Sequence, residues 1–295
     1  MTKLLKGQPV AEVIKEKIMK DVTVWKSQGH TPRMAALLVE GDTASEFYAH
    51  AKKRMAAKLG IEFELSTFPE GVSEQAILDT IKALNRDPAV HGIMLELPLP
   101  SHISQDLVIE AVSPAKDVDG LTRYNRHANV TGLPGLYPAT PIACVKLVEH
   151  YGYTVSGKHV ALIGCGKTVG MPLFHLLVRK NATVTACHAG TKDLSVHLSQ
   201  AEIAFVAVGV AGLIQSNMVH PDLIIVDAGI NETADHRIVG DVAPEAASVA
   251  LALSPTPGGV GTVTTVQLFA NLMDAMALQL NDRKESAVRL SRQHS

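Results

Sequence analysis

The chain has 295 residues, of which 46% are hydrophobic and 19% charged, and its formal net charge is −2. This length is enough for one large domain or two modest ones, each with a core. The balanced charge excludes the basic surface of a nucleic-acid-binding protein and a polybasic membrane patch. No apolar run is long enough to span a membrane, and the amphipathic N-terminus does not resemble a signal peptide. Three widely spaced cysteines suggest no disulfide framework and no metal site, so we expect a cytoplasmic location.

Helix and strand patterns alternate through the first half of the chain. Apolar residues at helical spacing predict a helix over 8–29. A second helix begins at a capping box of Thr43 and Glu46 and ends before Gly60, and a third covers 73–85. This alternation, with unbroken apolar strands, favours a parallel sheet covered by helices. The predicted strands are 34–41, 61–68 and 91–97.

A stretch rich in proline and glycine, 129–141, marks the boundary between two domains. Beyond it, a strand at 158–164, a glycine-rich turn and a helix from Met171 follow the layout of a doubly wound nucleotide-binding domain. The chain ends in a long helix, roughly 264–281, and a polar tail at 282–295 with a composition typical of disorder. Three further buried strands are predicted at 182–188, 203–209 and 223–230.

The glycine-rich turn contains Gly164, Gly166 and Gly170 in the pattern G-x-G-x-x-x-G. Glycines between a strand and a helix allow a tight turn and bring backbone N–H groups close to a pyrophosphate at the helix N-terminus. The last gap is one residue longer than in the usual fingerprint. A tight strand-to-helix turn without a ligand is the alternative interpretation.

The choice of dinucleotide is less clear from the residues. An NAD enzyme typically has Asp or Glu about twenty residues beyond the turn. Here the segment 187–191 reads C-H-A-G-T and has no carboxylate, which favours NADP and leaves NAD as an alternative. Only Lys167 and Lys192 are near enough in sequence to hold a 2′-phosphate, and both could equally be surface lysines.

The helix after the first apolar strand carries Ser45, Tyr48 and Lys52 at i, i+3 and i+7, which is one face of a helix. A hydroxyl, an aromatic ring and an amine on one stripe suggest a small-molecule site. The alternatives are a half-buried tyrosine and a surface lysine within a run of three cations.

Several motifs together resemble one family. They are S-x-x-Y-x-x-x-K at 45–52, L-P-L-P at 97–100, K-D-V-D-G at 116–120, T-P at 140–141, A-T-V-T-x-C-H at 182–188, D-x-G-I-N at 227–231, G-D-V at 240–242 and P-G-G-V-G at 257–261. In this order they resemble the methylenetetrahydrofolate dehydrogenase/methenyltetrahydrofolate cyclohydrolase family, and they cover almost the whole chain.

The resemblance implies a two-domain α/β protein. An N-terminal α/β folate domain would occupy 1–138, and a Rossmann-like, doubly wound parallel-sheet NAD(P) domain would occupy 139–263. The helix at 264–281 would cross back to the folate domain, and the protein would be a homodimer. The implied activities are oxidation of 5,10-methylenetetrahydrofolate with NADP and hydrolysis of the methenyl product to 10-formyltetrahydrofolate.

The resemblance also assigns residues. Lys52 would be the catalytic lysine, Tyr48 would stack on the folate, and Asp119 would accept two N–H groups of the pterin. Glu96 completes the implied catalytic set, and no metal is expected. The implied folate-binding residues are Ser45, Tyr48, Lys52, Leu95, Glu96, Leu97, Asp119, Pro257, Gly258, Gly259, Val260 and Gly261. The implied cofactor-binding residues are Gly164, Cys165, Gly166, Ala189 and Ile230.

Two departures from the family pattern bear on mechanism. Glu96 stands where members of the family usually have glutamine, and Cys165 and Gly166 replace the Arg and Ser of the usual G-R-S turn. An ionised Glu96 near Lys52 would favour the ammonium form, whereas proton transfer during hydrolysis needs that amine to release its proton. We therefore expect weakened hydrolysis and intact hydride transfer. A protonated or displaced Glu96 that acts like glutamine is the alternative.

Three other functions remain open on the sequence. The protein could be a dehydrogenase without hydrolase activity, or an NADP-linked dehydrogenase for a different carbonyl or pterin substrate. It could also be a folate- or nucleotide-binding paralogue without catalysis, because the glycine turn has lost its arginine.

Overall fold

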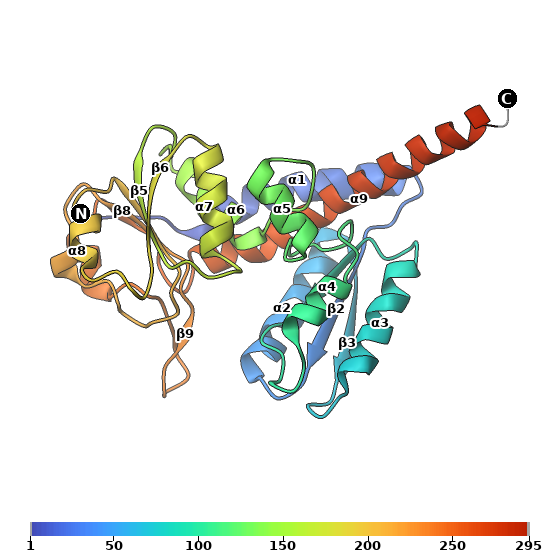
Figure 1. The fold of residues 1–295 in the computed structure, drawn as a ribbon, viewed down its shortest axis with the longest axis horizontal. Coiled ribbons are helices and arrows are strands. Elements are labelled where there is room, and N and C mark those ends of the chain that lie inside the picture. The colour runs from blue at the N-terminus through green and yellow to red at the C-terminus, as the bar shows by residue number, and fades with distance from the viewer. Residues whose placement is uncertain (1, 294–295) are drawn as a thin grey trace. The chain divides into compact units, whose positions relative to one another are not determined.

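The computed structural model describes the backbone of residues 2–293, and all side chains in that range except those of 43–44 and 281–293. Helices and strands alternate along the chain (Figure 1). Among the described residues, the helices are all too short or too polar to cross a membrane.

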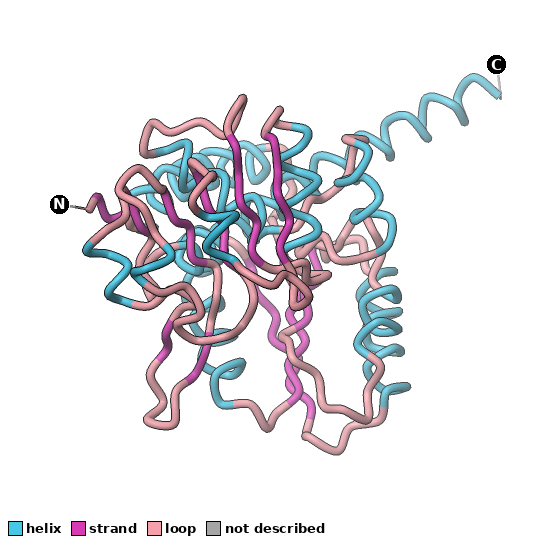
Figure 2. The backbone as a smooth tube through the Cα atoms, turned by 60° about the vertical axis from the view of Figure 1, so that its left-hand side comes forward, coloured by secondary structure: helices cyan, strands magenta, loops and turns pink. Residues whose placement is uncertain are grey.

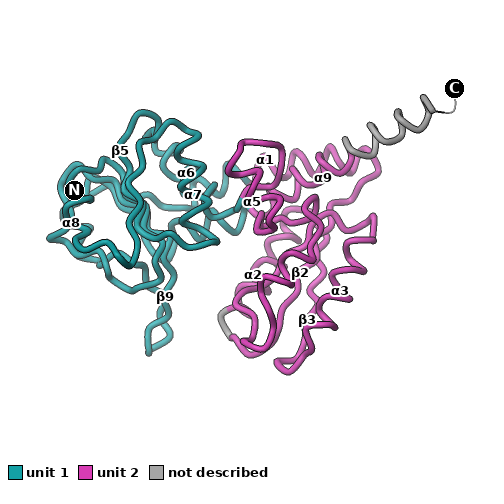
Figure 3. Tube along the Cα trace, viewed as in Figure 1, with its two compact units in different colours: residues 1–14, 138–267 teal, residues 15–137, 268–295 magenta. Residues whose placement is uncertain are grey.

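The chain folds as two compact units (Figure 3). Unit 1 contains residues 1–14 and 138–267, and unit 2 contains residues 15–137 and 268–295. The sequence placed the first fourteen residues in the N-terminal domain, but they group with the dinucleotide-type unit. Two of the three boundaries between the units fall inside helices, since α1 (Gly7–Ser27) and α9 (Val260–Gln293) each contribute to both units.

Unit 2 is built on a three-stranded parallel sheet in the order β3-β2-β4. Its strands are β2 (Arg33–Val39), β3 (Glu62–Phe68) and β4 (Gly92–Leu95). Ala35 lies opposite Glu64 on one side and Ile93 on the other. The β-α-β-α-β prediction is therefore confirmed for this unit.

The helix that follows β2 begins one residue earlier than the capping box suggested. In α2 (Thr43–Leu59) the N-cap is Asp42, whose carboxylate accepts the N–H of Ser45 at 2.9 Å. Aspartate is as good a cap as threonine, and its position one residue earlier satisfies a free N–H group of the first turn. The predicted stop is confirmed, because Gly60 adopts the left-handed conformation with φ 74°.

The helices α3 (Glu74–Arg86) and α4 (Gln105–Ala111) cover one face of this sheet. Their buried residues pack with those of β2 and β4 in one hydrophobic cluster. Gly92 on β4 leaves room for α9, because a Cβ there would lie 2.7 Å from a methyl carbon of Leu272. A further helix, α5 (Arg123–Thr131), ends at Gly132.

Unit 1 contains a six-stranded sheet in the order β1-β11-β8-β7-β5-β6, whose strands are drawn in magenta in Figure 2. Neighbouring strands in this sheet run parallel. The chain passes from β5 to β6 on one side and then returns to β7 on the other, so the strand order reverses between β5 and β7. The strands are β1 (Lys3–Leu4), β5 (His159–Ile163), β6 (Thr183–Cys187), β7 (Ile203–Val206), β8 (Ile224–Asp227) and β11 (Ala252–Leu253).

The strand β6 is less buried than the sequence predicted. Only Cys187 is buried in it, and Thr183 and Ala186 are exposed. The reason is position, since β6 is the edge of the sheet and has one neighbour, β5. By contrast, β7 and β8 lie in the middle of the sheet and are buried throughout, as predicted.

The remaining elements of unit 1 connect these strands. A short antiparallel hairpin of β9 and β10 follows β8, and Figure 1 shows it extending from the unit. The polar tail predicted at 282–295 lies outside the residues whose side chains are described. The connecting elements are α6 (Ala139–His150), α7 (Gly170–Arg179), α8 (Leu194–Leu198), η1 (Ser216–Met218), β9 (Asn231–Glu232), β10 (Ile238–Val239) and η2 (Pro244–Ser248).

Candidate active site

Unit 2 contains a buried ion pair between Lys52 and Glu96. Lys52 projects from α2 and Glu96 directly follows β4, and Lys52 Nζ lies 2.6 Å from Glu96 Oε2. The side chain of Glu96 is 5% exposed and that of Lys52 is 14% exposed. The second carboxylate oxygen, Oε1, is buried and has no hydrogen-bond partner among the described residues. A buried acceptor without a donor is costly unless a ligand completes it, so this atom points to a binding site.

Asp119 lies within electrostatic range of this pair. Its pKa is raised from 3.8 to about 7, mainly by burial, with Lys52 and a backbone hydrogen bond from Leu95 lowering it and the negative charges of Asp117 and Glu96 raising it. The lysine therefore does not fully compensate for the loss of solvation. A half-buried carboxyl group with such a pKa takes up or releases a proton near neutral pH, which is typical of functional sites.

The two aspartates of the K-D-V-D-G segment have different surroundings. Asp117 accepts the N–H groups of Leu121 and Thr122 and the amide of Asn125, which fixes the turn into α5. Lys116 donates to the carbonyls of Leu84 and Asp87 at the end of α3. Asp119 is thus the acidic group of this segment whose carboxylate is least used by the fold. The sequence singled out Asp119 and attached no role to Asp117 or Lys116.

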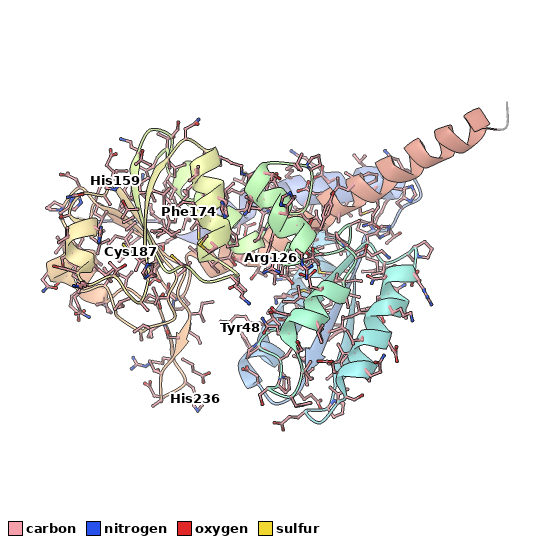
Figure 4. All side chains as sticks on the ribbon, in the orientation of Figure 1. Tyr48, Arg126, His159, Phe174, Cys187 and His236 are labelled. Carbon is pink, nitrogen blue, oxygen red and sulfur yellow. The ribbon has the colours of Figure 1, made fainter. Side chains whose placement is uncertain are left out.

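The other predicted folate-binding residues of this unit lie on the same two segments. Ser45 Oγ donates to the carbonyl of Leu97 at 3.3 Å, which ties the start of α2 to the segment after β4. Tyr48 is 38% exposed, and its ring lies edge-on to that of Phe47 (Figure 4). Tyr48 lies one turn from Lys52 on α2. Direct contacts and electrostatic interactions bring together six of the predicted residues: Ser45, Lys52, Leu95, Glu96, Leu97 and Asp119.

In unit 1 the glycine turn lies where the strand order reverses. Gly164 follows β5 with φ 111°, and a Cβ there would lie 2.1 Å from the carbonyl oxygen of Ala207, just after β7. A Cβ on Gly170 would lie 2.0 Å from the carbonyl oxygen of Gly164. Glycine is required at both positions, and the space around Gly166 is open. In open parallel sheets this reversal point is where dinucleotides bind, so the cradle fits such a cofactor.

Two buried aspartates hold the loops beside this turn. Asp241 accepts the N–H groups of Val208, Gly209 and Val210 at 2.6–3.0 Å. Asp227 in turn accepts the N–H groups of Gly229, Asp241 and Val242. A Cβ on Gly229 would lie 2.2 Å from the carboxyl carbon of Asp241, so the close packing of the D-x-G-I-N and G-D-V motifs requires glycine at position 229. Burial raises the pKa of Asp227 to about 6, although its three backbone hydrogen bonds lower it.

The predicted loop Pro257–Gly261 also belongs to unit 1. The carbonyl of Gly258 accepts the N–H of Gly7 at 2.7 Å, and a Cβ on Gly259 would lie 2.4 Å from the carbonyl oxygen of Pro255. The helix α9 begins within this segment, at Val260. The backbone here is closely packed against its own unit, and Gly261 has open space beside it.

The turn after β6 is held by its own side chains. Nδ1 of His188 accepts the N–H of Gly190 at 3.0 Å, and Thr191 Oγ1 accepts the N–H of His188 at 3.0 Å. Ala189 lies inside this turn and is exposed. The segment has no carboxylate to accept the hydroxyl groups of a ribose. Ile230, another predicted cofactor contact, is also exposed. Lys167 and Lys192, the two candidates for holding a 2′-phosphate, are exposed as well.

These features define a class of protein. A parallel sheet with a glycine cradle at its reversal point is a dinucleotide-binding domain. The second α/β unit carries a lysine and an acidic cluster suited to acid–base chemistry. Family models match both parts: the catalytic domain of tetrahydrofolate dehydrogenase/cyclohydrolase matches residues 5–119, and its NAD(P)-binding domain matches residues 138–280. The chain belongs to the tetrahydrofolate dehydrogenase/cyclohydrolase family.

Individual relatives agree with this assignment. The chain is 49% identical over 274 residues to the bifunctional protein FolD of Heliobacterium modesticaldum, a match that covers 92% of this chain and 96% of the relative. The crystal structure of the FolD dehydrogenase/cyclohydrolase of Campylobacter jejuni is 36% identical with a TM-score of 0.91, and covers 95% of this chain and all of that one. The enzyme of Trypanosoma brucei, solved with NADP and an inhibitor, is 27% identical with a TM-score of 0.90, and covers 95% of this chain and 98% of that one.

Proposed function

We propose that this protein oxidises 5,10-methylenetetrahydrofolate with NADP, and hydrolyses the methenyl product to 10-formyltetrahydrofolate more slowly than a glutamine-containing enzyme would. The family assignment supports both activities. The observation that carries the difference between them is the buried pair of Lys52 and Glu96 at 2.6 Å.

The roles of the side chains follow from their surroundings. Asp119 accepts the two adjacent N–H groups of the pterin, because its carboxylate is only lightly used by the fold. Tyr48 is exposed enough for its ring to stack on the folate. Bound NADP supplies the acceptor of the hydride. The glycine cradle holds its pyrophosphate, and the carboxylate-free turn around Ala189 favours NADP over NAD while leaving NAD as a weaker alternative.

Hydride loss leaves the folate as a cation. Glu96 and Asp119 surround Lys52 with more negative charge than the lysine can neutralise when both are ionised. A site of this kind stabilises positive charge as it develops on the substrate. Hydride transfer needs positioning rather than a proton donor, so it does not require Lys52 to change its charge.

Hydrolysis of the methenyl cation makes the opposite demand. Water must lose a proton as it attacks, and Lys52 is the amine placed to shuttle that proton. The ion pair with Glu96 stabilises the ammonium form and opposes its deprotonation. A glutamine at this position would hold the amine by a hydrogen bond without adding a charge.

The test is to measure both activities in wild type and in Glu96→Gln. We expect hydrolysis to rise by about tenfold in the variant, because a positioned acid–base group contributes ~10²–10⁴-fold and part of that contribution is recovered. The pH at which hydrolysis reaches half of its maximum should also fall. Glu62→Gln is the matched control, because it removes an exposed carboxylate from the same sheet. If hydrolysis in wild type equals or exceeds that of Glu96→Gln, the role of Glu96 is wrong.

The activity itself has a separate test. Reduction of NADP in the presence of 5,10-methylenetetrahydrofolate should be readily measured and should exceed reduction of NAD. Calorimetric titration then separates a catalyst from a binding paralogue. Binding of both ligands without turnover would contradict the proposed enzyme.

We also propose that the protein is a cytoplasmic homodimer. The edge strand β6 supports pairing through unit 1, because it has a strand neighbour on one side only in the described part of the chain. Light scattering during gel filtration would measure the mass of the assembly, and a monomer mass would contradict the dimer.

A further inference from the structure

Two thiols meet at the base of the dinucleotide turn. Cys165 lies inside the turn and is half-buried, and its Sγ–H donates to the carbonyl oxygen of Cys187 at 3.5 Å. Cys187 is the last residue of β6, where Figure 4 labels it, and it is 1% exposed. Both cysteines are free thiols. The folate chemistry proposed above uses neither sulfur atom.

The backbone brings the two residues within reach of a covalent bond. Ile163 on β5 pairs with Cys187 on β6, and the N–H of Gly164 donates to the carbonyl of Cys187 at 2.9 Å. Cys165 lies in the turn two residues beyond Ile163, and its Sγ contact with the Cys187 carbonyl places it beside the end of β6. Disulfides need Cα atoms no more than about 7 Å apart, so residues in direct contact such as these are the ones that can be bridged.

The turn also has room to adjust. Cys165 is flanked by Gly164 and Gly166, and apart from the neighbouring residues of the chain no atom lies within 4 Å of the position that a Cβ on Gly166 would take. The backbone on the Gly166 side of Cys165 therefore has open space into which it can shift.

The surroundings distinguish the roles of the two thiols. Burial raises the pKa of Cys187, and the nearby Cys165 raises it further, whereas a hydrogen bond with Thr191 lowers it. The influence of Cys165 on Cys187 agrees with their contact at the end of β6. Cys187 remains a protonated thiol at neutral pH, and the more accessible Cys165 is the sulfur that an oxidant reaches first.

We propose that Cys165 and Cys187 form a reversible disulfide that closes the dinucleotide turn under oxidising conditions. With a peroxide as the oxidant, the Cys165 thiolate attacks one peroxide oxygen, the O–O bond breaks, and Cys165 becomes a sulfenic acid with release of one water. The Cys187 sulfur then attacks the Cys165 sulfur, the S–O bond breaks, and a second water leaves with the thiol proton. Two thiols and one peroxide thus give one disulfide and two waters.

The consequence for the cofactor rests on the proposed function. The disulfide pulls the residue between Gly164 and Gly166 toward β6 and changes the direction of the backbone N–H groups that face the pyrophosphate. Loss of even one hydrogen bond to a charged phosphate weakens binding by about tenfold or more. Bound NADP should in turn protect Cys165 from the oxidant.

The experiment treats the full-length protein with hydrogen peroxide, blocks the remaining thiols, and maps the peptides by mass spectrometry. We expect one cross-linked peptide pair that contains Cys165 and Cys187, formed more slowly with NADP present and lost after dithiothreitol. This readout does not depend on catalysis, so it stands or fails separately from the folate activity. Absence of the cross-link would overturn the proposal.

Two variants isolate the pair. Cys187→Ala removes the partner sulfur from outside the turn and should abolish the effect of peroxide on the NADP dissociation constant. Cys144→Ala is the matched control, because Cys144 is fully buried in α6 and should leave the peroxide response as in wild type. If Cys187→Ala loses NADP binding after peroxide as strongly as wild type does, the effect arises from Cys165 alone and the disulfide is wrong.

Discussion

Each unit of this protein has two wholly or partly buried acidic residues at its candidate site, and the fold treats the two pairs in opposite ways. In unit 1, Asp227 and Asp241 each accept at least three backbone N–H groups. In unit 2, Glu96 accepts from Lys52 alone and keeps a buried oxygen without a partner among the described residues, while Asp119 has a single backbone hydrogen bond. Hydrogen-bond saturation therefore separates carboxylates that build the fold from those available to a ligand.

Sequence motifs alone do not make this separation. Asp119 and Asp227 both precede a glycine closely, in D-G and D-A-G, and both belong to family motifs. Burial raises the pKa of each. Only the count of donors shows that Asp227 is anchored by three backbone N–H groups, whereas Asp119 has one backbone hydrogen bond.

The largest effect that would test this comparison is on stability. Asp241→Ala leaves three partly buried N–H groups without an acceptor, and should lower the free energy of unfolding by about 3 kcal/mol. Glu96→Gln keeps the shape and a hydrogen-bond acceptor for Lys52, and should change it by about 1 kcal/mol or less. Urea unfolding followed by circular dichroism measures both. Equal losses in the two variants would mean that saturation does not distinguish the pairs.

A smaller effect concerns folate binding. Asp119→Asn removes a charged acceptor for the pterin and should weaken binding of the folate substrate by roughly tenfold to a hundredfold. Wild-type affinity should also decline as the pH falls below about 7, because protonation removes the carboxylate that the pterin needs. The asparagine variant should show no such decline. Asp235→Asn, on the exposed hairpin of unit 1, is the matched control. An unchanged affinity in Asp119→Asn would remove Asp119 from the site.

Local rules were enough to predict much of this molecule from its sequence. Gly60 at the end of α2, the glycine turn after β5 and the alternation of strands and helices each depend on residues close together in the chain. Helical spacing is enough to predict that Tyr48 and Lys52 share one face of α2. The family resemblance, rather than a local pattern, suggests that Lys52 lies near Glu96, with which it pairs.

Features that depend on distant contacts could not be predicted. Asp241 accepts from residues 31 to 33 positions earlier in the chain, and no local pattern reveals such a bond. The strand β1 has two exposed residues and forms only because β11, nearly 250 positions later, provides a partner. The exposure of β6 follows from its place at the sheet edge, which depends on the order of all the strands.

The smallest effect is a change of stability with pH, which has the same sign for Asp227 and Asp119 because the pKa of each is raised. A carboxyl group whose pKa is raised in the folded protein holds its proton there more tightly than in the unfolded chain. The free energy of unfolding therefore falls as the pH rises from about 4 through the folded pKa. Asp227, at about 6, completes its contribution before Asp119, at about 7.

Asp119→Asn removes the contribution of Asp119 and keeps that of Asp227. Both proteins should lose stability as the pH rises above about 4, and in the upper interval, from about pH 6 to pH 7, wild type should lose it more steeply than Asp119→Asn. Urea unfolding at closely spaced pH values measures the two curves. If the curves run parallel through the upper interval, the proton on Asp119 is not held by the fold. The acidic cluster around Lys52 would then be ionised before substrate arrives, and binding would have no proton to displace.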